Sequence, residues 1–241
     1  KDYAINWFHI NGKAAYCVPT QKTAAKSTDD IPSMLDSNVN LQKALYYGYG
    51  GSGDLTGKYF SGKSEEEKYA YTHIAVNYAY AGEAELSKEE LESAGVMAYI
   101  DFLFGQENPP SRKLSLPATS VDVILDGDIQ KTPEIQLEGD SRVSVKLNVP
   151  EDVTCYNVNR KESITNGDIQ IHGGDSFYFS AKGNVTGQYD SGDLYGSADG
   201  DWSVTALAAD GKQGIAVSEY PSTEPVRFCV NWSGQMNPTM K

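Results

Sequence analysis

The sequence predicts an α+β fold, with a β-sandwich-like or barrel-like core and an inserted helical lobe. Short runs of alternating apolar and polar residues near both ends of the chain are typical of strands, and apolar residues at helical spacing fill the part between them. We therefore expect a single domain over residues 1–241. Residues 1–29 and 108–241 would form the β core, and residues 30–107 the helical insertion.

The first strands flank an Asn-Gly pair. The apolar runs "YAINWFHI" and "AAYCV" lie on either side of Asn11 and Gly12. Because Asn-Gly readily adopts the positive φ angles of a two-residue hairpin turn, this arrangement predicts two antiparallel strands within residues 1–25.

Two capping-box patterns begin the main helices. Serine followed three residues later by glutamate occurs at residues 64–67 and again at 87–90. The patterns predict one helix that Gly82 ends and a second that Gly105 ends. A shorter helix, "NLQKALYYG", is expected before them. It leads into the loop "GYGGSGDLTG", which lacks the lysine of a phosphate-binding loop.

From about residue 114 onward the apolar residues recur with period two. Glycine, aspartate, asparagine and proline separate the runs, as expected of strands joined by turns. Many short strands at this spacing favour a sandwich or a barrel. The runs are "SVDVILDGD", "RVSVKLNVP", "SFYFSAKG", "DWSVTALAADG" and "VRFCVNW".

Composition and charge limit the classes of partner that we expect this protein to bind. The net charge of -13 argues against nucleic acid and anionic membranes, because both are polyanions. No apolar run is long enough to span a bilayer, so membrane insertion is not expected. The chain does not begin with methionine, and we expect it to be a processed segment of a longer protein. Scattered histidines and cysteines give no zinc spacing, and "DSGDLYGSADGD" lacks that of an EF-hand, so no metal or other cofactor is expected.

The three cysteines leave two alternatives open. Cys155 and Cys229 form a disulfide and Cys17 stays alone, or all three remain thiols, as is usual in large domains with few cysteines. The odd number means that at least one thiol is unpaired within the chain.

Cys17 with a histidine also has the composition of a Cys–His hydrolase. His73 and His172 are the candidate bases. A nucleophilic thiolate usually lies at a helix N-terminus or beside a cation, whereas Cys17 lies in a predicted strand that ends at Pro19. This position makes the hydrolase the weaker hypothesis.

Tyrosines concentrate in the predicted helical lobe. A tyrosine-rich helix interface is sufficient to explain them. The alternative is an aromatic shield over a water-sensitive group. The residues are Tyr46, Tyr47, Tyr49, Tyr69, Tyr71, Tyr78 and Tyr80.

Four segments in order resemble the motifs of bacterial thioester domains, which lie at the tips of Gram-positive surface adhesins and pili. The family has an early cysteine after an aromatic residue, then a tyrosine-rich loop. A helix with a Thr-Gln-x-Ala-Ile-Trp signature and a late glutamine before apolar residues follow. The matching segments are "YCV" at 16–18, "ALYYGYGG" at 44–51, "THIAVNY" at 72–78 and "KQGIAV" at 212–217. His73 and Asn77 depart from the pattern, since they stand where the family has glutamine and tryptophan.

The resemblance implies an internal thioester between Cys17 and Gln213. Gln170, in "DIQIHGG", is a second candidate for the glutamine. The family's site-supporting positions correspond here to Tyr16, Tyr47, Tyr49, Thr72 and His73.

The resemblance also implies a function. The thioester would react once with an amine, most plausibly a lysine of a host surface or matrix protein, so the chain would not be an enzyme. We expect a monomeric adhesin module that is secreted and anchored to the bacterial cell wall. The alternatives are a non-covalent surface-binding or stalk domain that has lost the thioester, and the Cys–His hydrolase.

Overall fold

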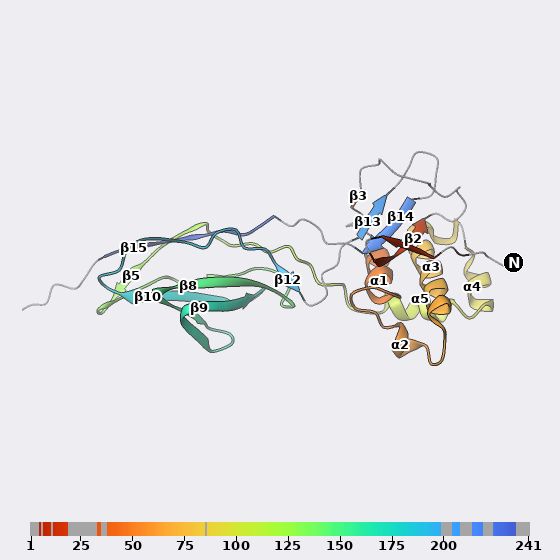
Figure 1. Cartoon of the computed structure of the whole chain (residues 1–241), viewed down its shortest axis with the longest axis horizontal. Coiled ribbons are helices and arrows are strands. Elements are labelled where there is room, and N and C mark those ends of the chain that lie inside the picture. Colours follow the sequence, from red (N-terminus) through yellow and green to blue (C-terminus); the bar gives the residue numbers. More distant parts are fainter. Residues whose placement is uncertain are drawn as a thin grey trace, which may run out of the picture. The chain divides into compact units, whose positions relative to one another are not determined.

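The computed structural model divides the chain into two compact units. Unit 1 comprises residues 1–109 and 200–221, and unit 2 comprises residues 110–199 and 222–241. The chain therefore forms most of unit 1 first and most of unit 2 next. It then adds two strands to unit 1 and ends in unit 2 (Figure 1). The structure describes residues 5, 7–10, 12–18, 33–34, 38–84, 86–198, 204–207, 214–218 and 224–234.

Unit 1 combines an antiparallel sheet with helices. The strand order is β1-β2-β14-β13-β3, so strands from the two ends of the chain lie side by side. The strands are β1 (Phe8–Ile10), β2 (Lys13–Val18), β3 (Ser33–Met34), β13 (Val204–Leu207) and β14 (Gly214–Ser218). The helices are α1 (Val39–Tyr47), α2 (Thr56–Tyr59), α3 (Glu65–Ala81), the 3-10 helix η1 (Gly82–Ala84), α4 (Lys88–Ser93) and α5 (Met97–Phe104).

Local signals account for most of these elements. Ile10 pairs with Lys13 across the predicted two-residue turn, which confirms the first hairpin. Ser64 accepts from the backbone N–H of Glu67, and the Glu67 side chain accepts from that of Ser64, so the capping box that begins α3 is confirmed. The prediction of one continuous helix from residue 88 to Gly105 is wrong, because the structure has two helices there. Gly95, at φ +68, separates α4 from α5.

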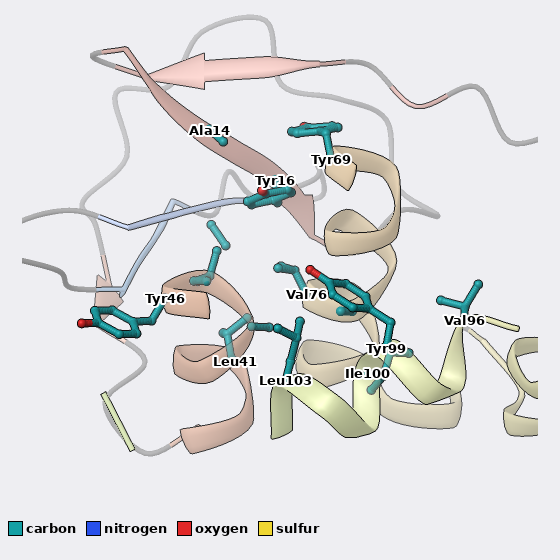
Figure 2. Packing of buried hydrophobic residues seen from close by; sticks show 14 of the residues in the cluster. Ala14, Tyr16, Leu41, Tyr46, Tyr69, Val76, Val96, Tyr99, Ile100 and Leu103 are labelled. Carbon is teal, nitrogen blue, oxygen red and sulfur yellow. The ribbon is translucent and has the colours of Figure 1, made fainter. Parts of the chain in front are cut away.

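One hydrophobic cluster holds unit 1 together. Side chains from one face of β2 meet those of α1, α3 and α5, and Tyr16, Tyr69 and Tyr99 are among the largest fully buried ones. Figure 2 shows the rings of Tyr16 and Tyr69 beside the strand and that of Tyr99 among the helices. The tyrosine-rich lobe is therefore a buried interface as well as a surface feature.

Unit 2 is made of two sheets. The larger has the order β12-β8-β10-β6-β5, with β7 paired to β10 and β9 to β8, and the smaller has the order β11-β15-β4. Both contribute to a second hydrophobic cluster, through Phe179 of β10 and Val230 of β15 for example. The strands are β4 (Ser120–Asp122), β5 (Ile124–Asp126), β6 (Ile129–Lys131), β7 (Ile135–Gln136), β8 (Val143–Asn157), β9 (Glu162–His172), β10 (Ser176–Lys182), β11 (Thr186–Asp190), β12 (Ser197–Ala198) and β15 (Cys229–Ser233).

The α+β class predicted from sequence is confirmed, but the division into two units differs from the single domain expected over 1–241. Alternation identifies a strand without saying which sheet it joins. The late strands β13 and β14 complete the sheet of β2, whereas β15 joins β11 and β4. The helices of residues 30–107 therefore pack on a sheet of their own unit and are not an insertion into the core of unit 2.

None of the three cysteines forms a disulfide. Cys155 is fully buried in β8, and burial raises the pKa of its thiol to about 12. Cys229 is half-buried in β15, and no disulfide joins it to Cys155. Among the described residues, no helix combines the length and the apolarity needed to cross a membrane.

Candidate functional site

Cys17 lies in β2, which pairs with β1 over residues 13–15 and with β14 over residues 15–18. β1 lies on one side and β14 on the other, and Ile215 of β14 is the residue opposite Cys17. Cys17 is 4 % exposed, and burial raises the pKa of its thiol. The group is therefore a neutral thiol shielded from bulk water.

Helix α3 holds the backbone of β2 through two hydrogen bonds. Asn77 Nδ2 donates to the carbonyl oxygen of Cys17 at 2.9 Å, and the Tyr69 hydroxyl donates to that of Ala15 at 2.7 Å. Both donors are buried, so the bonds form where water does not compete. They fix the strand segment that carries the cysteine against the helix.

A chain of hydrogen bonds ties Tyr16 to the tyrosine-rich loop. The Tyr16 hydroxyl donates to the carbonyl of Tyr49 at 2.5 Å, and the backbone N–H of Tyr49 donates to Thr72 Oγ1 at 3.0 Å. Thr72 Oγ1 also lies 2.8 Å from the Tyr99 hydroxyl. Burial holds the pKa of Tyr16 well above its usual value, so its phenol remains a neutral donor. The network joins β2, the loop, α3 and α5.

The loop approaches α3 too closely for a side chain at residue 48. A Cβ atom on Gly48 would lie 2.3 Å from both the Ala44 carbonyl oxygen and Thr72 Cγ2. Asp54 closes the loop, since its carboxylate accepts from the backbone N–H of Gly50 at 2.9 Å and of Thr56 at 2.7 Å. The glycine-rich sequence thus serves close packing beside Thr72.

His73 is buried beneath the same strand. It is 5 % exposed, and its ring meets those of Tyr16 and Tyr69 edge to face at 6.0 and 5.9 Å between centroids. Burial lowers its pKa to about 4, against the opposing effect of the Cys17 carbonyl. Within the described part of the chain, no hydrogen bond of ordinary geometry reaches either ring nitrogen. At neutral pH the imidazole is uncharged.

The structure brings most of the site-supporting residues together. Tyr16, Tyr49 and Thr72 share one network, and His73 contacts Tyr16. Tyr47 is half-buried and meets Tyr46 edge to face at 4.8 Å between ring centroids.

Three further residues of this cluster were not predicted as site residues. They are Tyr69, Asn77 and Tyr99, and each bonds to a group already named. A sequence signal for Asn77 exists in retrospect. A polar residue one helical turn after His73, in an apolar stretch of α3, indicates a buried amide with a specific partner.

The two candidate glutamines differ in position. Gln213 lies outside the described residues and immediately precedes Gly214, the first residue of β14. Gly214 is opposite Val18. Gln170 is exposed in β9 of unit 2, opposite Lys146.

His73 does not form an activated pair with Cys17. The pKa of the Cys17 thiol is raised and that of His73 is lowered, and both shifts oppose a thiolate–imidazolium pair. His172 lies in unit 2, with Nδ1 3.7 Å from Asp175 Oδ2. Among the described residues, no group of three or more histidine, cysteine, aspartate or glutamate side chains could hold a metal ion.

Comparison with known families gives two matches. The thioester domain model matches residues 1–110, and the model of the thioester-domain-associated β-sandwich matches residues 115–198. These ranges follow the change from the helical part of unit 1 to the strands of unit 2. Comparison with curated proteins gives no match.

Two solved structures are similar. The Bacillus anthracis TIE protein has a TM-score of 0.57 at 17 % identity, over 96 % of this chain and 47 % of that chain. The thioester domain of the Enterococcus faecium TIE86 protein has a TM-score of 0.46 at 12 % identity, over 93 % of this chain and 84 % of that chain. The first similarity indicates a shared fold, and this chain spans about half of that structure.

Proposed function

Because the chain belongs to the thioester domain family through residues 1–110, we propose that it is a covalent adhesion module in which an internal thioester joins Cys17 to Gln213. The module would act once, by transferring the Gln213 acyl group to an amine of its target. It would then remain attached through the new amide bond.

The pairing of β2 with β14 carries this proposal. Cys17 is opposite Ile215 in this antiparallel pair, and Gln213 is two residues before Ile215 in the sequence. Directly opposite residues have Cα atoms about 4.5–5.5 Å apart, and diagonal neighbours about 7–8 Å apart. The register supports Gln213 as the partner of Cys17. The exposure of Gln170 argues against it, because water would hydrolyse an unshielded thioester.

Formation of the bond needs no cofactor. The Cys17 sulfur attacks Cδ of Gln213, the C–N bond breaks, and the amide nitrogen leaves as ammonia with the thiol proton. The thioester then stores an electrophilic carbonyl, because sulfur stabilises it less by resonance than nitrogen does. Burial of Cys17 excludes water and keeps the two reacting groups in one geometry.

Reaction with the target breaks the C–S bond. The amine attacks the Gln213 carbonyl carbon, Cys17 leaves as a thiolate, and one amine proton returns to the sulfur. A thiol of high pKa is a poorer leaving group, so the burial that raises the pKa of Cys17 supports a thioester that persists until an amine arrives.

We infer that the target amine is a lysine of a host surface or matrix protein, and that the module is displayed on a Gram-positive cell, on a pilus or a wall-anchored adhesin. Non-covalent affinities saturate near about -18 to -21 kcal/mol. A covalent bond exceeds this limit, which suits a protein that must hold under flow.

Intact mass spectrometry with and without methylamine tests the proposal. The protein should be lighter than its sequence mass by one ammonia, and methylamine should add its full mass. Cys17→Ala and Gln213→Ala should each abolish the deficit and the adduct, whereas Cys229→Ala and Gln170→Ala should keep both. A full sequence mass with no adduct would favour the non-covalent binding or stalk domain instead.

A further inference from the structure

An aromatic group at the surface of unit 1 leads to the strand that carries Cys17. Trp7 is 39 % exposed, and its ring lies 5.5 Å from that of Tyr69 and 5.9 Å from that of Tyr49. Tyr69 in turn stacks on Tyr16 with 4.9 Å between centroids and an interplanar angle of 18°. The rings thus form a continuous path from solvent to the residue before Cys17.

Backbone register places the start of this path beside β2, on the side of the strand where Tyr16 packs against the helices. Trp7 immediately precedes Phe8, the first residue of β1, and Phe8 is opposite Ala15. The Tyr69 hydroxyl bridges the two strands, since it accepts from the backbone N–H of Phe8 at 3.3 Å and donates to the Ala15 carbonyl at 2.7 Å. The exposed indole is therefore close to the reactive strand of its own unit.

A carboxylate accompanies the aromatic rings. Glu65 is exposed at the start of α3, and hydrogen bonds from Lys68 and from the Tyr49 hydroxyl lower the pKa of its carboxyl group. The carboxylate is therefore ionised at neutral pH. Lys68 Nζ lies 2.7 Å from Glu65 Oε1, so an incoming ammonium would share this carboxylate with Lys68. Rings and a carboxylate together attract an organic cation, and the chain as a whole carries a net charge of -13.

The same unit already holds an ammonium group in such surroundings. Lys63 Nζ lies 4.8 Å from the ring centroid of Tyr71 and 5.8 Å from that of Phe60, with the Glu67 carboxylate at 3.0 Å. Aromatic faces and one glutamate are thus a combination that this protein uses to hold a lysine side chain.

We propose that Trp7, Tyr49 and Glu65 form a recognition surface for the lysine ammonium group of the target protein. The inference rests on the proposed thioester and names the part of the chain that selects its amine. An ammonium held at this surface would release one proton to solvent before the amine attacks the Gln213 carbonyl. Overall, one ammonium and one thioester give one amide, one Cys17 thiol and one proton.

Two nucleophiles of different charge test the proposal. The rate of adduct formation is measured by mass spectrometry with Nα-acetyl-lysine N-methylamide, which is cationic, and with hydroxylamine, which is neutral near pH 7.5. For the lysine derivative, Trp7→Leu and Glu65→Gln should each lower the second-order rate constant about two- to fivefold, the range expected of an exposed cation–π contact for Trp7 and of an exposed ion pair for Glu65. Trp7→Phe, which keeps a ring, should lose less.

Reaction with hydroxylamine should be the same in all these variants, which also shows that the folded site is intact. Tyr195→Leu removes an exposed ring in unit 2, and Glu66→Gln removes the neighbouring exposed carboxylate of α3, so both serve as controls expected to leave the two rates unchanged. Raising the salt concentration should slow only the lysine derivative.

Two results overturn the inference while leaving the thioester in place. The lysine derivative reacts equally fast with wild type and Trp7→Leu, or both nucleophiles slow by the same factor, which would indicate a structural role for Trp7. Absence of any adduct from the wild type with either nucleophile overturns the proposed thioester, and this inference with it.

Discussion

The side-chain amide of Asn77 in α3 is bonded to the backbone carbonyl of Cys17 in β2, with 2.9 Å between Nδ2 and the oxygen. The same Nδ2 lies 3.0 Å from the His73 carbonyl, and both bonds are buried. One amide therefore ties the cysteine strand to the helix beneath it. Substitution of Asn77 therefore tests how unit 1 holds the strand that carries Cys17.

Asn77→Ala should lower the free energy of unfolding of the protein by about 1–3 kcal/mol, because it leaves the buried Cys17 carbonyl without its donor. The same change should speed hydrolysis of the proposed thioester, since the strand is held less firmly. Denaturant unfolding and the decay of methylamine reactivity measure the two effects. Asn148→Ala removes an exposed bond to Asp168 and should cost much less. Equal costs for the two variants would contradict this prediction.

Tyr16→Phe keeps the ring stacked on Tyr69 but removes the hydroxyl bonded to the Tyr49 carbonyl. Loss of one buried hydrogen bond costs about 1–3 kcal/mol when its partner stays unsatisfied. The loop that begins at Gly48 should then open more often, and the thioester should lose its reactivity with methylamine faster on storage. Tyr195→Phe, at an exposed position, is the control. An unchanged storage half-life in Tyr16→Phe would show that this bond does not protect the site.

His73 should make the protein less stable in mild acid. Its pKa is about 4 in the folded protein, and an unfolded histidine titrates near about 6.5. The unfolded chain therefore takes up a proton first, and the free energy of unfolding falls as the pH decreases from about 6.5 to 4. By pH 4.5 the loss should be about 2–3 kcal/mol.

His73→Gln separates this effect from other titrations. Urea unfolding at pH 7 and at pH 4.5 should show a smaller loss of stability for His73→Gln than for the wild type. Asp140 and Asp190, whose pKa values are lowered to about 2 by Arg142 and Arg227, titrate in the variant as well and cancel in the comparison. Identical losses in the two proteins would mean that His73 is not buried in its neutral form.

Gln130 should be the most sensitive polar residue of unit 2. It is fully buried in β6, and its side chain joins the segment after β10 to the end of β15. Gln130→Ala should cost about 3 kcal/mol or more, since several buried or part-buried backbone groups lose their partner at once. Gln188→Ala, which removes an exposed bond to Asn231, should cost little. Nε2 donates to the carbonyls of Lys182, Gly183 and Val185, and Oε1 accepts from Ser233 N, Ser233 Oγ and Gly234 N.

Local sequence signals were sufficient to predict the elements that depend only on residues close together in the chain. The Asn-Gly turn gave the first hairpin, and the serine–glutamate spacing gave the start of α3. The break at Gly95 was missed because the apolar periodicity continues across it, and only a positive φ angle at that residue reveals the interruption. The division into two units could not be predicted, because strand alternation does not specify partners, and β14 joins a strand almost 200 residues earlier in the chain.

The candidate site could be predicted from the motif resemblance more than from the chemistry of individual residues. The motif matches indicated Tyr16, Tyr49 and Thr72, which the structure joins in one network. Asn77 was noted only as a departure from the family pattern. Its position in an apolar stretch of α3 indicates burial, but its contact with Cys17 depends on how α3 packs against β2, which the local sequence does not specify.

Peptide mapping of the untreated protein is the most direct test of the proposed thioester. After digestion without reducing agent, we expect a covalent pair of peptides, one with Cys17 and one with Gln213, lighter than their sum by one ammonia. Methylamine should release the pair and leave a methylamide on Gln213. A free Cys17 peptide with an unmodified Gln213, or a methylamide on Gln170 instead, would contradict a thioester between Cys17 and Gln213.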